Sequence, residues 1–294
     1  MEPAHKGSDL MKVLRMVGIS YRKLFNTERP YLILILMLVL LWGYTQPMFR
    51  FSVQQDAPMQ IFEPFISLFT TMTITLFPML GLLFLLNDAP FIEDDTLYVL
   101  TRSSKVAWAA ARILYMVSLI IIYYFLILST TCLMSAGRAY LDNRWSETAY
   151  LLSSTQAATV ENVPIFIDAG ILWSTLPLHA MIHTFVLACL YGCFVGMLLF
   201  LINLLSGKLI GFGVILFVHV LSYILAYATP NTDFYYLSPH LMSLLANYQF
   251  GTGYGLQLPY GYAVLILINS LFVGCILAVC KKKGDYITKE GQSR

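Results

Sequence analysis

Residues 176–205 read LPLHAMIHTFVLACLYGCFVGMLLFLINLL, a run without a single Asp, Glu, Lys or Arg. About 20 apolar residues in a helix cross the ~30 Å hydrocarbon core of a bilayer, so this run is long enough to span a membrane. A membrane-barrel strand needs only ~10 residues, and backbone groups in lipid must be satisfied within their own segment. The run therefore predicts a membrane-spanning α-helix.

Further apolar runs lie on both sides of this one, near residues 31–49, 65–86, 108–136, 209–229 and 260–280. Together the six runs predict an all-α integral membrane protein with six transmembrane helices and both termini on one side. The composition agrees, because 58% of the 294 residues are apolar, only 12% are charged and the mean hydropathy is +0.71. Soluble domains carry roughly 25% charged residues. A net charge of +2 leaves no basic surface for nucleic acid, which we exclude as a partner.

The distribution of Lys and Arg predicts the orientation, because these residues concentrate at the cytoplasmic ends of membrane proteins. One side of the predicted spans carries only Arg50, Arg138 and Arg144. The other side carries the remaining 15 of the 18 cationic residues: Lys6, Lys12, Arg15, Arg22, Lys23, Arg29, Arg102, Lys105, Arg112, Lys208, Lys281, Lys282, Lys283, Lys289 and Arg294. We therefore expect both termini to be cytoplasmic, in a multi-pass protein of the cell (plasma) membrane of a bacterium.

These boundaries divide the chain into three parts. We expect a cytoplasmic N-terminus over residues 1–30, a six-span domain over residues 31–280 and a cytoplasmic basic tail over residues 281–294. Within the six-span domain, residues 88–106 form a cytoplasmic segment. Residues 137–175 and 230–259 form the two longer extracellular segments, and the second of them contains no Lys or Arg.

Residues 9–26 predict an amphipathic helix that lies on the membrane. At 100° per residue, the apolar side chains of Leu10, Leu14, Val17 and Tyr21 fall on one face, and basic side chains fall opposite. The helix is either an interfacial elbow that transmits force into the first span or a passive anchor on acidic lipid. The pattern supports both interpretations.

The cytoplasmic segment that follows the second span predicts a short amphipathic helix. Pro90 ends the preceding helix, and the carboxylates of residues 93–95 complement the positive end of a new one. Leu97 and Leu100 then share a face, and Ser103 or Ser104 can cap the long third helix. An ordinary capped connector remains the alternative.

This segment resembles the exporter-type permease subunits of ATP-binding-cassette (ABC) transporters, the ABC-2-type permease family. Their second and third spans are joined by an acidic residue, Gly-Thr, a Leu-containing turn and basic residues. This chain offers them in the order Glu93, Thr96, Leu97, Leu100, Lys105 and Arg112, with Asp95 where Gly is usual and Ser where Pro is usual. Tyr236-Leu237-Ser238-Pro239 also resembles the Pro-containing stretch that precedes the last span in that family. The order of the helical segments along the whole chain also agrees with that family. The similarity in individual residues covers only residues 93–112 and 236–239.

The resemblance implies a permease subunit that binds two copies of a separate ABC ATPase subunit and pairs with a second permease subunit, as a homodimer or a heterodimer. It implies that the short cytoplasmic helix docks in a groove of the ATPase, so that the coupling residues would be Glu93, Asp94, Asp95, Thr96, Leu97, Leu100 and Arg102. It also implies that the outer segment before the last span forms a pair of short helices.

The chain itself lacks the phosphate-binding loop G-x-x-x-x-G-K-[ST]. In its Gly207-Lys208 pair, the residue five positions before Gly207 is Ile202, and Leu209 follows Lys208. We therefore expect no enzymatic activity and no cofactor on this chain, with Mg-ATP bound by the partner ATPase. Peptides, antibiotics and lipids all remain compatible as cargo. A secondary carrier or channel driven by an ion gradient is the alternative, although such carriers usually place ionisable groups in mid-membrane.

Polar side chains within the apolar runs are candidates for a substrate path. Ser67, Thr71 and Thr75 recur every four residues in the second run, and His183 and His219 lie in the fourth and fifth. Hydroxyls of this kind also bond to helix carbonyls or across helices, so packing is the competing interpretation. His179 and His183 lie one turn apart but lack the Glu of H-E-x-x-H and a third ligand, so we predict no metal site.

A stripe of small residues occurs on the fourth predicted span, at Ala188, Gly192 and Gly196. Small side chains let helix backbones approach closely in membranes. These positions predict tight helix packing, either within the subunit or against a neighbour.

Overall fold

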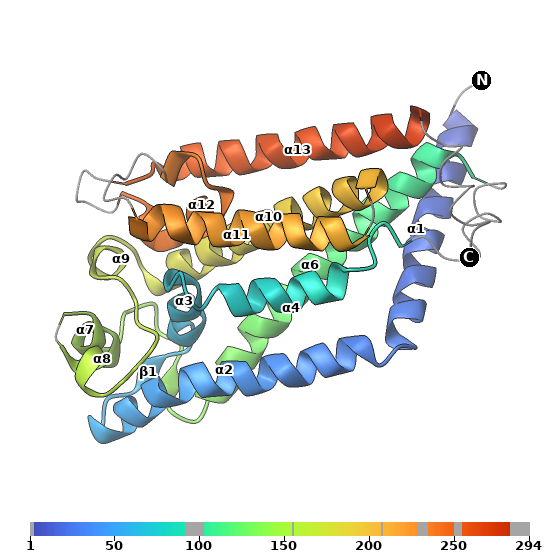
Figure 1. Ribbon diagram of the computed structural model, residues 1–294. Helices are drawn as coiled ribbons and strands as arrows, with labels where there is room; N and C mark the ends of the chain where they lie inside the picture. Colours follow the sequence, from blue (N-terminus) through green and yellow to red (C-terminus); the bar gives the residue numbers. More distant parts are fainter. Residues whose placement is uncertain are drawn as a thin grey trace.

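A computed structural model describes residues 3–91, 103–154, 156–206, 208–228, 235–249 and 255–282 (Figure 1). The long helices are α1 (Pro3–Phe25), α2 (Arg29–Gln54), α6 (Lys105–Ser135), α10 (Pro177–Ser206), α11 (Lys208–Ala228) and α13 (Leu258–Lys282). The shorter elements are β1 (Met59–Gln60), α3 (Glu63–Thr70), α4 (Leu76–Leu86), β2 (Ala139–Tyr140), α7 (Glu147–Ser154), α8 (Ala157–Val160), α9 (Ala169–Ser174), α12 (Pro239–Ser243) and η2 (Leu245–Asn247).

The long helices form a bundle with α10 at its centre. Helix α10 contacts α3, α4, α6, α11 and α13, and 61% of its most apolar 18-residue stretch is buried, against 17% for α13. Helix α1 crosses one end of the bundle, which we call the α1 end, and α7, α8 and α9 cover the opposite end, the α7 end (Figure 1). The described chain begins at Pro3 and finishes at Lys282, both at the α1 end.

The expectation of a helical membrane protein is confirmed, since five described helices are long and apolar enough to cross a bilayer. They are α2, α6, α10, α11 (over Ile210–Tyr227) and α13. The second apolar run, residues 65–86, does not form the one span that the sequence predicts, because it is divided into α3, of 8 residues, and α4, of 11 residues. Neither piece alone reaches the ~20 residues that a span needs.

The division of this run lies at residues 71–75, where Thr71 leaves the helical conformation and is extended, with φ −92° and ψ 108°. The hydroxyls of Thr70 and Thr75 donate to the carbonyl oxygens of Ser67 at 3.0 Å and Met72 at 2.6 Å on either side of this break. Pro78 then lies in the first turn of α4, where a missing N–H costs nothing, instead of at a kink in a continuous helix.

The N-terminal amphipathic helix is present as α1, and it begins before residue 9, at Pro3. Leu10 and Leu14 are 61% and 54% exposed, whereas Val17, Tyr21 and Leu24 pack against the hydrophobic core. The helix therefore has one apolar part available to a membrane surface and another fixed to the bundle.

The segment over residues 137–175 forms a cap at the α7 end. Strand β2 pairs in parallel with β1, placing Met59 opposite Ala139, and α7 contacts α8, α9 and β1. The indole of Trp145 donates to the carbonyl oxygen of Thr175 at 2.7 Å. The residues before α13 contribute α12, which packs against α10 and α13, and η2, which packs against α10 and α3.

The small-residue stripe lies where α10 packs against α4 and α6. A Cβ atom added to Gly192 would lie 2.8 Å from Ile120 and 2.8 Å from Tyr124, and one added to Gly196 would lie 3.1 Å from Met116. Ala188 is also buried, at 4% exposure.

We expect Gly192→Ala to lower the free energy of unfolding by about 1–3 kcal/mol, because Ile120 and Tyr124 must move to admit the methyl group. Gly213→Ala is the matched control: nothing lies within 4 Å of a Cβ there, so better helix propensity should stabilise the protein by about 0.5–1 kcal/mol. Thermal unfolding of the two variants in detergent measures the difference, and equal melting temperatures would contradict the packing interpretation.

Candidate functional site

The predicted coupling residues 93–97, 100 and 102 lie outside the described residues, but both flanks of that segment are described. On the C-terminal side of the segment, which we call the far flank, the Ser104 hydroxyl accepts a hydrogen bond from the N–H of Ala107 at 3.1 Å and caps α6, as the sequence predicted. On the N-terminal side, α4 ends at Leu86, and residues 87–91, which we call the near flank, connect α4 to the segment.

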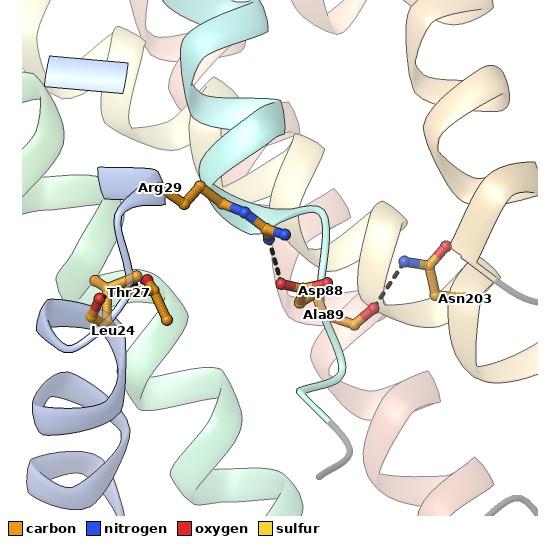
Figure 2. A network of polar contacts seen from close by, with 6 residues as sticks. All are labelled: Leu24, Thr27, Arg29, Asp88, Ala89 and Asn203. Carbon is orange, nitrogen blue, oxygen red and sulfur yellow. Dashed lines mark hydrogen bonds and ion pairs between the residues drawn. The ribbon is translucent and has the colours of Figure 1, made fainter. Parts of the chain in front are cut away.

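The near flank is fixed to two different helices (Figure 2). Arg29, the first residue of α2, donates to and forms an ion pair with the carboxylate of Asp88. The side-chain amide of Asn203, in the last turn of α10, donates to the carbonyl oxygen of Ala89 at 2.7 Å. The chain that leads to the predicted coupling residues is therefore connected to both α2 and α10.

Helix α1 is connected to the same end of the bundle through α6. The Arg112 guanidinium donates to the Ser20 hydroxyl at 2.7 Å, and the hydroxyls of Tyr21 and Ser118 are 2.8 Å apart. The α1–α2 elbow is closed by the hydroxyl of Thr27, which donates to the carbonyl oxygen of Leu24 at 2.7 Å (Figure 2). Helices α1, α2, α6 and α10 thus meet at the flanks of one segment.

A second polar group lies buried inside the bundle, and we call Thr75, Tyr191, His219 and His240 the histidine cluster. The Tyr191 hydroxyl is 2.8 Å from Nδ1 of His219, and the Thr75 hydroxyl is 2.9 Å from Nε2 of His240. The two imidazole rings are 4.0 Å apart between centroids. Nδ1 of His240 has no hydrogen-bond partner among the described residues. The cluster therefore joins α4, α10, α11 and α12 through polar contacts in an apolar interior.

We expect Thr75→Val to lower the free energy of unfolding by about 1–3 kcal/mol, because it leaves both ring nitrogens of buried His240 without a partner. Thr73→Val is the control, since Thr73 is exposed on the same short segment. Thermal unfolding in detergent checks the pair. A cost for Thr73→Val as large as that for Thr75→Val would show that the effect comes from the segment and not from the histidine contact.

The predicted path residues do not gather in one place. Thr75 and His219 both belong to the histidine cluster, whereas buried Ser67 contacts the sulfur of Met48 at 4.0 Å and the Thr71 hydroxyl donates to the Ser67 carbonyl oxygen at 3.4 Å. His183 contacts the hydroxyl of Tyr262 at 2.8 Å, in the part of α10 near the α7 end.

His179 and His183 line a surface hollow at the α7 end, together with residues of the 137–175 segment such as Arg144 and Trp173. Among the described residues, no group of three or more His, Cys, Asp or Glu side chains is placed to hold a metal ion.

A buried carboxylate at the α7 end was not singled out by the sequence. Glu63, the first residue of α3, is fully buried, and it accepts hydrogen bonds from the N–H of Gln60 at 3.1 Å, the N–H of Ser146 at 2.8 Å and the Ser146 hydroxyl at 2.7 Å. Burial raises its pKa to about 7 although these three donors act in the opposite direction. The hydrogen bonds from Ser146 to Glu63 therefore connect the cap to α3, and they involve a carboxyl group whose pKa lies near 7.

His240 and Asn203 were also missed, for different reasons. His240 follows the Tyr236–Pro239 stretch that the sequence marked, but nothing local indicates that it contacts His219. Asn203 is a single amide in an apolar run, and its polarity was the only signal that the sequence offered.

Comparison with protein-family models, with curated proteins and with solved structures finds no match.

Proposed function

We propose that this chain is the membrane-spanning permease subunit of an ABC exporter of the ABC-2 type. In this proposal the α1 end faces the cytoplasm, two copies of a separate ATPase subunit bind Mg-ATP there, and residues 93–102 are the docking contact. A second permease subunit, identical or similar, completes the translocation path. The chain moves cargo and breaks no covalent bond.

The observation that carries this proposal is the connection at the near flank of the docking segment. A force applied to residues 93–102 reaches α2 through the Asp88–Arg29 ion pair and α10 through the Ala89–Asn203 hydrogen bond. Helix α10 in turn contacts α3, α4, α6, α11 and α13. A push on one short segment can therefore be transmitted to the bundle as a whole, which is what a pump with an external motor requires.

The excess of Lys and Arg at the α1 end supports the orientation, because such residues favour the cytoplasmic side. The exposed apolar surface leaves room for the pairing, since only 22% of the most apolar stretch of α2 and 17% of that of α13 are buried. In the proposal, a second subunit covers part of these faces and lipid covers the rest.

A proton-driven carrier is the second candidate, and the histidine cluster favours it. Ionisable groups within membrane spans mark proton pathways in pumps and carriers. His219 and His240 lie in ring contact inside the bundle, and five of the six apolar runs contain no Asp, Glu, Lys or Arg, the run 108–136 with Arg112 being the exception. This alternative predicts transport by the single purified chain under a proton gradient alone.

The test is ATP turnover by the complex purified in a mild detergent. We expect an ATPase with a phosphate-binding loop to co-purify with the chain. Glu93→Lys should reduce both the amount of ATPase that co-purifies and the ATP turnover of the complex. Glu161→Lys, an identical charge change at an exposed residue beside α8, is the control and should leave both unchanged. Normal association in Glu93→Lys, or an equal loss in Glu161→Lys, would contradict the docking assignment.

A further inference from the structure

Helix α11 packs against α10 along one narrow face. Among its described side chains, the buried ones are Gly211, Ile215, His219 and Ser222, which are spaced three or four positions apart. Only 22% of the most apolar stretch of α11 is buried, against 61% for α10, which is enclosed on several sides. Sliding of packed helices is a common mode of conformational change, and a helix held by one stripe has the fewest contacts to rearrange. Of the two helices, α11 is therefore the one that can shift.

The first buried residue of α11, Gly211, lies against the amide of Asn203, which holds the near flank (Figure 2). Nδ2 of Asn203 donates to the carbonyl oxygen of Ala89 at 2.7 Å, and Oδ1 has no hydrogen-bond partner among the described residues. A Cβ atom added to Gly211 would lie 1.8 Å from this Oδ1. The amide thus lies between the near flank on one side and the α11 backbone on the other. We call Ala89, Asn203 and Gly211 the inner joint.

The last buried residue of α11, Ser222, connects the helix to α12. The Ser238 hydroxyl donates to the Ser222 hydroxyl at 2.7 Å, and the same Ser238 oxygen accepts from the N–H of Leu241 at 3.3 Å and caps α12. Nearly one turn earlier on α11, the ring of His219 lies 4.0 Å from the ring of His240, which belongs to α12. We call Ser222, Ser238, His219 and His240 the outer joint.

The two joints lie on the same face of one continuous helix. Ser222 follows Gly211 by 11 positions, which is close to three turns of 3.6 residues. At 1.5 Å per residue, the two positions are roughly 16 Å apart along the helix axis. A displacement of the near flank therefore has a direct route to α12 at the other end of α11. This route is separate from the ion pair that connects the near flank to α2.

We propose that α11 couples the position of the near flank to the position of α12, and that Gly211 and Ser222 are the positioning residues at its two ends. The source of the motion, an ATPase on residues 93–102, rests on the proposed function, whereas the coupling is a property of the folded chain. A methyl group on Gly211 would displace the Asn203 amide and break its bond to Ala89. In the proposed exporter, α11 delivers each push on the docking segment to the α7 end.

The experiment is hydrogen–deuterium exchange of the purified chain in detergent, which needs no ATPase. Backbone amides that are hydrogen-bonded in the near flank and in α12 report on the two joints. We expect Gly211→Ala to speed exchange about tenfold at both sites, because the displaced α11 loosens both of its ends. Gly213→Ala is the matched control. Nothing lies within 4 Å of a Cβ there, so this change should speed exchange at neither site.

Ser222→Ala is the reciprocal variant, and it decides the question if Gly211→Ala fails to fold. It removes the hydroxyl that accepts from Ser238, while Ser238 can still cap α12. Coupling between two sites acts equally in both directions, so exchange should rise in the near flank as well as in α12. Ser270→Ala, at an exposed position of α13, should change neither. A rise confined to the end that carries the substitution, or an equal rise in α7, which would indicate general loosening, would overturn the proposal.

A second measurement uses the complex with the ATPase. Gly211→Ala should lower the amount of cargo transported per ATP hydrolysed at least about fivefold, and Gly213→Ala should leave this ratio unchanged. An unchanged ratio in Gly211→Ala would overturn the role of α11 in coupling. If no ATPase associates with the wild-type chain, the proposed function fails, and the exchange experiment still decides whether α11 connects the two joints.

Discussion

Asp88→Arg is expected to lower ATP-driven transport at least about tenfold while leaving the melting temperature in detergent nearly unchanged. The Arg29–Asp88 ion pair has both side chains 45% exposed. Exposed pairs of this kind contribute only about 0–1 kcal/mol to stability, so the fold should survive its loss. In the proposed mechanism, however, the same pair carries motion from the docking segment to α2, and two facing arginines would push the flank away from it.

The charge-swapped double variant Arg29→Asp with Asp88→Arg provides the control. It restores an ion pair between the same two positions and leaves the net charge of the protein unchanged. Turnover and transport should recover to within a few-fold of wild type, as expected for coupled residues. If the double variant is as inactive as Asp88→Arg, the pair has a role other than mechanical connection. If the single variant is fully active, the proposed route into α2 is wrong.

Lowering the pH from 8 to 5 is expected to stabilise the cap through Glu63 by about 2.5 kcal/mol. The pKa of this carboxyl is raised from 4.5 to about 7 in the folded protein, chiefly because of its burial. A raised pKa means that the folded state holds the proton more tightly, so the stabilisation is complete below pH 4.5 and is lost as the pH rises through 7. Each unit between those two values corresponds to ~1.36 kcal/mol.

Thermal unfolding between pH 5 and 8 measures this effect, with Glu63→Gln as the test variant. Gln cannot ionise, so the pH dependence should flatten, although the amide can still accept one or two of the three hydrogen bonds from Gln60 and Ser146. Glu161→Gln, at an exposed position in the same cap, should retain the wild-type profile. A Glu63→Gln profile that still falls from pH 5 to 8 would assign the titration to another group.

The sequence predicted those features that depend on neighbouring residues. The continuous apolar runs gave five helices of spanning length, and Ser104 caps α6 as its position indicated. The prediction for the second run, residues 65–86, was wrong, because hydropathy averages over residues 70–75 and does not register the extended backbone at Thr71.

The pattern of apolar and polar residues along the sequence could not predict contacts between distant segments. Glu63 and Ser146 are separated by 83 positions, and Ala89 and Asn203 by 114. His219 was named, but its neighbour His240 belongs to a different segment of the chain. Periodicity describes one helix at a time, so it predicts which side chains face inward and not which of them meet.

Photo-crosslinking in intact cells shows whether residues 93–102 are engaged by a separate ATPase, as we propose. A benzophenone amino acid is placed at Leu97 or, for comparison, at Val160, which is 69% exposed in the cap at the α7 end. We expect position 97 to capture a chain bearing the phosphate-binding loop and position 160 not to capture it. Capture of that chain from position 160, or its absence at position 97 while the protein transports its cargo, would rule out docking at residues 93–102.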